Sequence, residues 1–123
     1  MAPKRRRLSR SGEFDRVYRD GLSHATRYLV LYSFPRSEEG DQRVRLGVSA
    51  SRKVGGAVER NRAKRCLREA FWSLSEQLPP GHDFVVVARP EISALIEREG
   101  TDGIRASLEE ALAGTTSGRW RST

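Results

Sequence analysis

The alternation of apolar and polar positions predicts one long helix at the centre of the chain. From Ala57 onward, apolar residues recur at the spacing of a helix that packs along one side. This stripe consists of Ala63, Leu67, Ala70, Phe71, Leu74 and Leu78. Gly55 and Gly56 precede the stretch, and Pro79-Pro80-Gly81 cannot continue a helix. We therefore expect a helix that begins near Ala57 and ends near Leu78.

Three other stretches have the pattern of strands. Residues 27–34 alternate, and Tyr28, Tyr32 and Phe34 share one face. Both faces of this stretch are largely apolar, so the strand is either buried on both sides or offers a stacking surface. Residues 43–50 also alternate, whereas residues 83–89 form a continuous apolar run, typical of a central strand. We expect these last two strands to pair, with the long helix connecting them.

Shorter helices are expected near both ends of the chain. Ser11 suits a helix N-cap and Gly21 a helix end, so a first helix should lie between them. Phe14 and Tyr18 share one side of it, where core packing is the usual role. A short helical piece should follow Pro90, and residues 102–113 carry the apolar stripe of a last helix.

The charge of the chain points to an anionic partner. The 123 residues suit one domain, and 23 Lys and Arg against 16 Asp and Glu give a net charge of +7. RNA, DNA and an anionic membrane all remain open on this ground. The long helix is cationic on its flanks and back, where the acids are only Glu59 and Glu69. That shortage favours a polyanion opposite the helix over an ordinary solvated surface.

Several classes of site are disfavoured. The single cysteine, Cys66, cannot form an intrachain disulfide or a cysteine-based zinc cluster, and a buried structural thiol is the favoured interpretation. His24 and His82 are far apart in sequence and lack metal-site or acid–base spacing. No long apolar run or signal peptide is present, so we expect a cytoplasmic protein. The central helix also has too little spare apolar surface for a membrane role.

The central stretch resembles the signature of the bacterial ribonuclease P protein subunit, nearly position for position. The matching residues are Gly55, Ala57-Val58, Arg60-Asn61-Arg62, Lys64-Arg65 and Arg68-Glu69-Ala70-Phe71. The similarity extends to residues 14–18, 27–32, 46–51 and 83–89. It implies a single α+β domain of α-β-β-β-α-β-α order, similar to the second domain of ribosomal protein S5. The sheet would be four-stranded and mostly antiparallel, with a left-handed β-α-β crossover.

The resemblance also implies a function. In this family a large RNA subunit hydrolyses a phosphodiester with Mg²⁺, which removes the 5′ leader of precursor tRNA. The protein binds the ribonuclease P RNA subunit and guides the leader. On this basis the protein has no catalytic residue and no metal ligand of its own, Mg²⁺ is held mainly by RNA, and the protein alone is inactive and monomeric.

Two sets of residues match the family's binding positions. The first set should contact the RNA subunit and comprises Arg60, Asn61, Arg62, Lys64, Arg65 and Arg68. The second should line the leader-binding cleft and comprises Phe14, Tyr18 and Tyr32, with Arg52 and Lys53 at the helix N-terminus. Arg60 falls toward the apolar side of an ideal helical wheel, so it belongs either to the helix or to the turn entering it.

The expected organisation has three parts. Residues 1–10 form a basic arm. This arm either is adaptable and becomes ordered when it binds an RNA phosphate backbone, or serves only to keep the protein soluble. Residues 11–113 form the RNA-binding domain, and residues 114–123 a flexible tail. The rival hypothesis is an RNA-binding module of ribosomal or RNA-chaperone type with no role in tRNA processing. A protein-only nuclease is disfavoured, because no set of residues suggests a protein active site.

Overall fold

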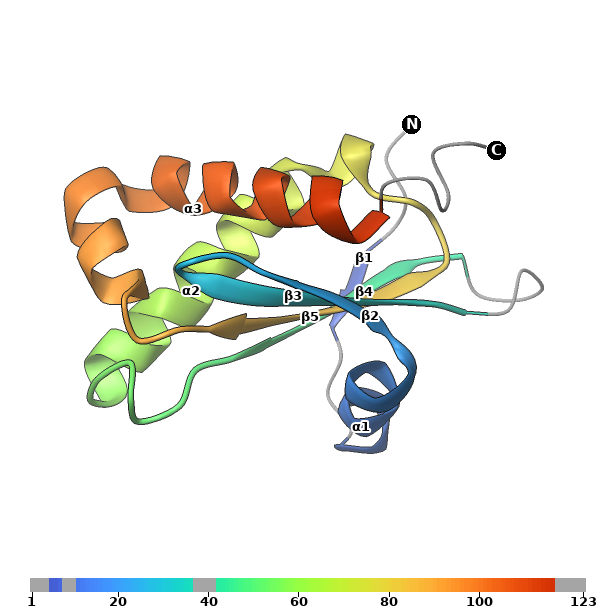
Figure 1. Ribbon diagram of the computed structural model, residues 1–123, viewed down its shortest axis with the longest axis horizontal. Coiled ribbons are helices and arrows are strands. Elements are labelled where there is room, and N and C mark those ends of the chain that lie inside the picture. The colour runs from blue at the N-terminus through green and yellow to red at the C-terminus, as the bar shows by residue number, and fades with distance from the viewer. Residues whose placement is uncertain (1–4, 8–10, 37–41, 117–123) are drawn as a thin grey trace.

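The computed structural model describes residues 5–7, 11–36 and 42–116, and it confirms the α-β-β-β-α-β-α order (Figure 1). One short strand precedes this series. The elements are β1 (Arg5–Arg7), α1 (Ser11–Asp20), β2 (Leu22–Ala25), β3 (Leu29–Pro35), β4 (Val44–Ser49), α2 (Ala57–Ser73), the 3-10 turn η1 (Ser75–Gln77), β5 (His82–Ala88) and α3 (Ile92–Thr116).

The sheet has the strand order β1-β4-β5-β3-β2. Within β2 to β5, the β2–β3 and β3–β5 pairs are antiparallel and the β4–β5 pair is parallel, so this part is mostly antiparallel as expected. The parallel pair is connected by α2, because a parallel connection needs a crossover. The strand β5 is central, and its residues 83–86 are buried.

Two observations bear on the expected arm and tail. Residues 5–7 of the arm form β1, which pairs in parallel with β4 and adds a fifth strand at the sheet edge. At the other end, α3 continues to Thr116, three residues beyond the expected boundary at 113. The division into arm, domain and tail otherwise stays a prediction, because residues 1–4, 8–10 and 117–123 lie outside the described part.

The two faces of the sheet carry two separate apolar clusters. The larger cluster packs α2 and α3 on one face, and it contains every residue of the predicted helix stripe, from Ala63 to Leu78. The smaller cluster lies under α1 on the opposite face and centres on Val17 and Val85. Figure 1 shows α1 on its own side of the sheet, away from α2 and α3. Burial of the smaller cluster therefore helps to attach α1 to the sheet.

The ends of the helices follow local chemistry. The Gly56 amide donates to Glu59 Oε1 at 2.9 Å, which satisfies one free donor at the start of α2. The helix ends at Ser73, five residues before the expected end near Leu78, and the 3-10 turn η1 carries the chain on toward Pro79. The last helix is interrupted at Gly100, where φ is 63°. A side chain disfavours this left-handed conformation, so glycine separates the expected short helical piece from the last helix.

Candidate RNA-binding surfaces

The aromatic residues predicted for the leader-binding cleft come together in the structure. Phe14 and Tyr18 extend from α1, and Tyr32 comes from β3. The ring centroids of Phe14 and Tyr18 are 6.3 Å apart, and those of Tyr18 and Tyr32 are 5.0 Å apart, edge to face. Tyr18 is 39% exposed, while the other two rings are half-buried. We call these three residues the aromatic surface.

Tyr18 is held from the sheet as well as from its own helix. Its phenol hydrogen-bonds to Ser49 at the end of β4. Partial burial is the main reason that the pKa of Tyr18 is raised, and the neighbouring Tyr32 raises it further, while the Ser49 hydrogen bond opposes the shift. The phenol therefore stays neutral at physiological pH. A neutral ring that is held by the backbone of α1 and by the hydrogen bond of its hydroxyl is suited to stacking.

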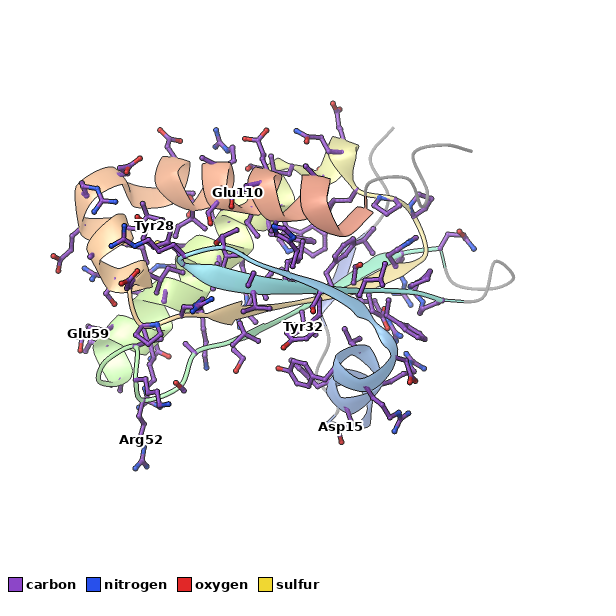
Figure 2. The ribbon with its side chains drawn as sticks, in the orientation of Figure 1. Asp15, Tyr28, Tyr32, Arg52, Glu59 and Glu110 are labelled. Atoms are coloured by element: carbon purple, nitrogen blue, oxygen red, sulfur yellow. The ribbon has the colours of Figure 1, made fainter. Side chains whose placement is uncertain are left out.

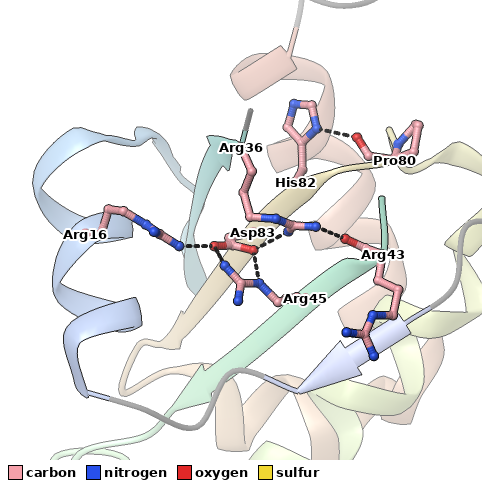
Figure 3. A network of polar contacts seen from close by, with 7 residues as sticks. All are labelled: Arg16, Arg36, Arg43, Arg45, Pro80, His82 and Asp83. Carbon is pink, nitrogen blue, oxygen red and sulfur yellow. Dashed lines mark hydrogen bonds and ion pairs between the residues drawn. The ribbon is translucent and has the colours of Figure 1, made fainter. Parts of the chain in front are cut away.

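A buried carboxylate lies beside the aromatic surface and gathers three arginines (Figure 3). Arg45 binds both oxygens of Asp83, with Nε–Oδ1 and Nη2–Oδ2 distances of 2.6 Å. Arg36 Nη1 lies 2.5 Å from Oδ1, and Arg16 Nη2 lies 3.0 Å from Oδ2. The Asp83 side chain is fully buried. We call these four residues the Asp83 cluster.

Electrostatics keep this carboxylate ionised. Burial by itself would raise the pKa of Asp83, but hydrogen bonds from Arg45 and Arg36, together with their charges, lower it below its usual value. The neighbouring His82 behaves differently: burial lowers its pKa, and its Nδ1 lies 2.9 Å from the Pro80 carbonyl oxygen. A neutral His82 therefore adds no charge to a cluster whose three cations already outnumber its one anion.

The Asp83 cluster ties α1 to the sheet. Arg16 belongs to α1, Arg36 follows β3, and Arg45 and Asp83 are register partners on β4 and β5. The Arg16 guanidinium also lies 5.1 Å from the centroid of the Phe34 ring, a cation–π contact. Sequence reasoning missed this cluster. The available signal was an acidic residue at the start of an otherwise apolar central strand.

The cationic residues of the family signature lie along α2, as predicted. Asn61 and Arg65 are exposed, and the others are half-buried. We call the set of Arg60, Asn61, Arg62, Lys64, Arg65 and Arg68 the basic helix surface. Arg60 lies within α2, and its Nε donates to the Gly56 carbonyl at 3.4 Å, so the side chain turns toward the helix start.

One acidic partner of the basic helix surface comes from another element. Arg62 Nη2 lies 3.8 Å from Glu97 Oε1 on α3. The sequence pattern showed only the acids on the long helix itself, so this tertiary pair was missed. Glu97 is 72% exposed, and the pair is therefore a weak surface contact.

Arg52 and Lys53 do not join the aromatic surface. Both are exposed in the turn between β4 and α2, where the Lys53 amide donates to Ser51 Oγ at 3.3 Å. Figure 2 shows Arg52 projecting from the end of the molecule, well away from Tyr32 and Asp15. Arg52 therefore lies apart from the three rings, and the assignment of Arg52 and Lys53 to the leader stays a prediction.

The described residues offer little else for chemistry. Within residues 5–7, 11–36 and 42–116, no three His, Cys, Asp or Glu side chains gather as metal ligands. Cys66 is half-buried and packs against the larger core cluster. No helix in the described part of the chain is long and apolar enough to span a membrane.

Comparison with known proteins identifies relatives along almost the whole chain. The family model Ribonuclease P matches residues 2–113. The ribonuclease P protein component of Shouchella clausii is 44% identical over 109 residues, covering 89% of this chain and 84% of the relative. That of Geobacillus thermodenitrificans is 37% identical over 122 residues, covering 98% of this chain and 96% of the relative.

Solved structures agree with the sequence matches. The RNase P protein of Staphylococcus aureus superimposes with a TM-score of 0.71 at 36% identity, covering 86% of this chain and 91% of that one. The RNase P protein of Thermotoga maritima gives 0.72 at 32% identity, covering 85% and 92%. Because the family model, the relatives and the fold all agree with the signature on α2, the chain belongs to the ribonuclease P protein family.

Proposed function

We propose that this protein binds the catalytic RNA subunit of ribonuclease P and holds the 5′ leader of precursor tRNA while the leader is removed. One observation carries the proposal. The chain of a ribonuclease P family member presents two separate surfaces suited to RNA, one on each side of its sheet. The basic helix surface belongs to α2. The aromatic surface lies where α1 packs on the other face of the sheet.

The basic helix surface suits the folded RNA subunit. Arg65 and Asn61 are exposed and free to reach phosphates and sugar edges. Cations that neutralise phosphates release condensed counterions, which supplies much of the affinity. The Arg62–Glu97 pair is weak and its carboxylate is largely exposed, so exchanging that carboxylate for a phosphate costs little. This surface would anchor the protein without reading sequence.

The aromatic surface suits a single strand. Each base that stacks on an aromatic ring contributes about 1–3 kcal/mol, whatever the base. Tyr18 and Tyr32 meet edge to face, so their ring planes differ by 82° and a strand would have to turn between them. The Asp83 cluster holds the helix that carries Phe14 and Tyr18. Such a surface would hold leaders of different sequence.

The protein's part in catalysis would be positioning. Asp83, the fully buried carboxylate, has both oxygens bound by arginines, so it is poorly suited to ligate a cation. We therefore assign Mg²⁺ to the RNA subunit, where it would stabilise charge on the attacking and leaving oxygens. The protein's residues would fix the leader against that site and so favour precursor over mature tRNA.

Reconstituted cleavage tests this function. A precursor tRNA is incubated at low Mg²⁺ with a bacterial ribonuclease P RNA, with and without this protein, and also with the protein alone. We expect the protein alone to be inert and the mixture to make the correct 5′ end much faster than the RNA alone. Binding of RNA without any gain in cleavage would instead support a general RNA-binding module.

Two substitutions separate the two surfaces. Phe14→Ala should weaken binding of precursor tRNA but leave the affinity for the RNA subunit unchanged, because Phe14 belongs to the aromatic surface. Arg65→Ala should weaken the affinity for the RNA subunit, because Arg65 is exposed on α2. Equal effects of both variants on both ligands would contradict the assignment.

A further inference from the structure

A shallow groove opens at the C-terminal half of α2, where the family signature ends. Its volume is about 470 Å³, and it is lined by Arg65, Arg68, Glu69, Trp72 and Ser73. Trp72 is half-buried, and its ring meets Phe71 edge to face at 5.0 Å. Phe71 is fully buried in the larger core cluster, so the indole is anchored from below while it forms part of the groove wall.

The groove continues the basic helix surface along the same line of the helix. Asn61, Arg65, Arg68 and Trp72 follow one another at spacings of four, three and four residues. At about 3.6 residues per turn, these spacings place all four side chains in one stripe. An RNA strand that follows the exposed cations of α2 toward its C-terminus would therefore reach the indole.

The charge around the groove favours a polyanion over a protein partner. Two arginines and one glutamate line it. A third arginine, Arg105 of α3, stands at its edge, where its Nε donates to Ser73 Oγ at 3.0 Å. Arg105 also lies 3.6 Å from Asp102, but that carboxylate is 85% exposed and the pair is weak. Cations around an aromatic ring are the combination that binds a nucleotide by its phosphate and its base.

We propose that this groove binds an unpaired nucleotide of the ribonuclease P RNA subunit, with the base against the Trp72 indole and the phosphate between Arg65 and Arg68. The inference rests on the proposed function and adds to it a subsite in which Trp72, which follows the signature, joins the signature residues Arg65 and Arg68. It also gives Trp72 a role beyond packing. The groove lies on α2, across the sheet from the aromatic surface, so it would not take the leader.

Tryptophan emission tests the proposal directly. The chain has two tryptophans, Trp72 and Trp120, so Trp120→Phe leaves Trp72 as the only one. Titrating this variant with ribonuclease P RNA should quench the emission, because a stacked base quenches an indole. Emission that does not change while the RNA binds would overturn the proposal.

Substitution of Trp72 gives a second, independent measurement. Trp72→Leu keeps an apolar side chain against Phe71 but removes the stacking ring, and it should weaken the affinity for the RNA subunit about 5- to 150-fold. Trp72→Phe retains a ring and should stay within a few-fold of the parent. Wild-type affinity in Trp72→Leu would overturn the proposal. If Trp72→Leu fails to fold, the emission experiment still decides, because it keeps Trp72.

The two hypotheses fail in different ways. If the protein neither binds the RNA subunit nor accelerates cleavage, the proposed function is wrong and the subsite with it. If cleavage is accelerated while the emission of Trp72 stays constant and Trp72→Leu binds normally, only the subsite is wrong. The affinity for precursor tRNA leader should be the same in Trp72→Leu as in the parent.

Discussion

At the scale of single residues, Asp83 shows how a buried charge can be both costly and necessary. The Arg36 and Arg45 side chains that face it are only 11% and 10% exposed. Removing the carboxylate would take away the buried anion that both guanidiniums contact. Breaking such a buried pair by removing one partner costs roughly 3–5 kcal/mol.

We therefore expect Asp83→Asn to lower the free energy of unfolding at neutral pH by roughly that amount, as measured by urea unfolding. Glu109→Gln is a matched control, because Glu109 is an exposed acid on α3. A loss below about 1 kcal/mol, the size of an ordinary point substitution, would mean that the cluster is not structurally important.

The same cluster predicts a pH dependence. Folding lowers the pKa of Asp83, so the ionised form is favoured in the folded protein. The resulting stabilisation is fully present above the pKa of the unfolded chain, about 3.9. It is lost as the pH falls through the lower pKa of the folded state. Wild-type stability should decline below about pH 4 more steeply than that of Asp83→Asn. Parallel declines in urea unfolding would refute this linkage.

Tyr18 allows stacking to be separated from hydrogen bonding. Its ring belongs to the aromatic surface, and its hydroxyl bonds Ser49. Tyr18→Ala should cost about 1–3 kcal/mol of affinity for precursor tRNA in the holoenzyme. Tyr18→Phe, which keeps the ring, should cost much less. Affinity for mature tRNA, which has no leader, is the control and should not change. If it fell equally, Tyr18 would not be a leader contact.

At the scale of elements, α1 is positioned by a close backbone approach at its end. A Cβ atom at Gly21 would lie 2.5 Å from the Val17 carbonyl oxygen and 2.7 Å from that of Ser33. Both are main-chain atoms, so neither can move aside without shifting α1 or β3. Gly12, at the start of the same helix, has nothing within 4 Å of such a Cβ. The test position directly follows α1, and its control lies in the first turn of the same helix.

Gly21→Ala should destabilise the protein by about 1–3 kcal/mol and weaken leader binding, because α1 carries Phe14 and Tyr18. Gly12→Ala should be neutral or stabilising by up to about 1 kcal/mol, since alanine loses less entropy on folding. Urea unfolding and precursor binding measure both effects. The expectation fails if the two variants behave alike.

At the scale of the whole molecule, the predictable parts are those with strong local patterns. The stripe from Ala63 to Leu78 located α2, and the apolar run at residues 83–89 located β5 to within one residue. By contrast, Leu22–Ala25 lacks a clear alternation, and β1 consists of three arginines. Both strands depend on pairing with a neighbour, which the local sequence does not encode.

The same division applies to the candidate site. The basic helix surface was predicted because the family signature is a compact sequence pattern, and the aromatic surface because Phe14, Tyr18 and Tyr32 match the family's positions. The Asp83 cluster joins residues separated by 67, 47 and 38 positions, and the Arg62–Glu97 pair joins two helices. Such contacts arise from topology, so single-sequence patterns do not reveal them. The functional roles of all these residues remain predictions.

The placement of two RNA surfaces on opposite faces of one sheet has an energetic consequence. Tyr18 lies on α1 and Arg65 on α2, helices that pack on opposite faces of the sheet, and the two residues share no partner among the described contacts. Effects at such sites usually add within about 0.5 kcal/mol. The measurement is kcat/KM for precursor tRNA at substrate concentrations below saturation. Expressed as free energies, the loss in the Tyr18→Ala, Arg65→Ala double variant should equal the sum of the losses in the two single variants.

Salt provides the complementary measurement. Arg65→Ala should reduce the slope of log affinity against log salt by about 1, because one phosphate contact is lost, whereas Tyr18→Ala should leave the slope unchanged. A coupling energy well above 0.5 kcal/mol in the double variant, roughly 1 kcal/mol or more, would show that the two surfaces act as one. RNA would then have to pass continuously around the sheet edge, and the exposed Arg52 and Lys53, between β4 and α2, would be the natural bridge.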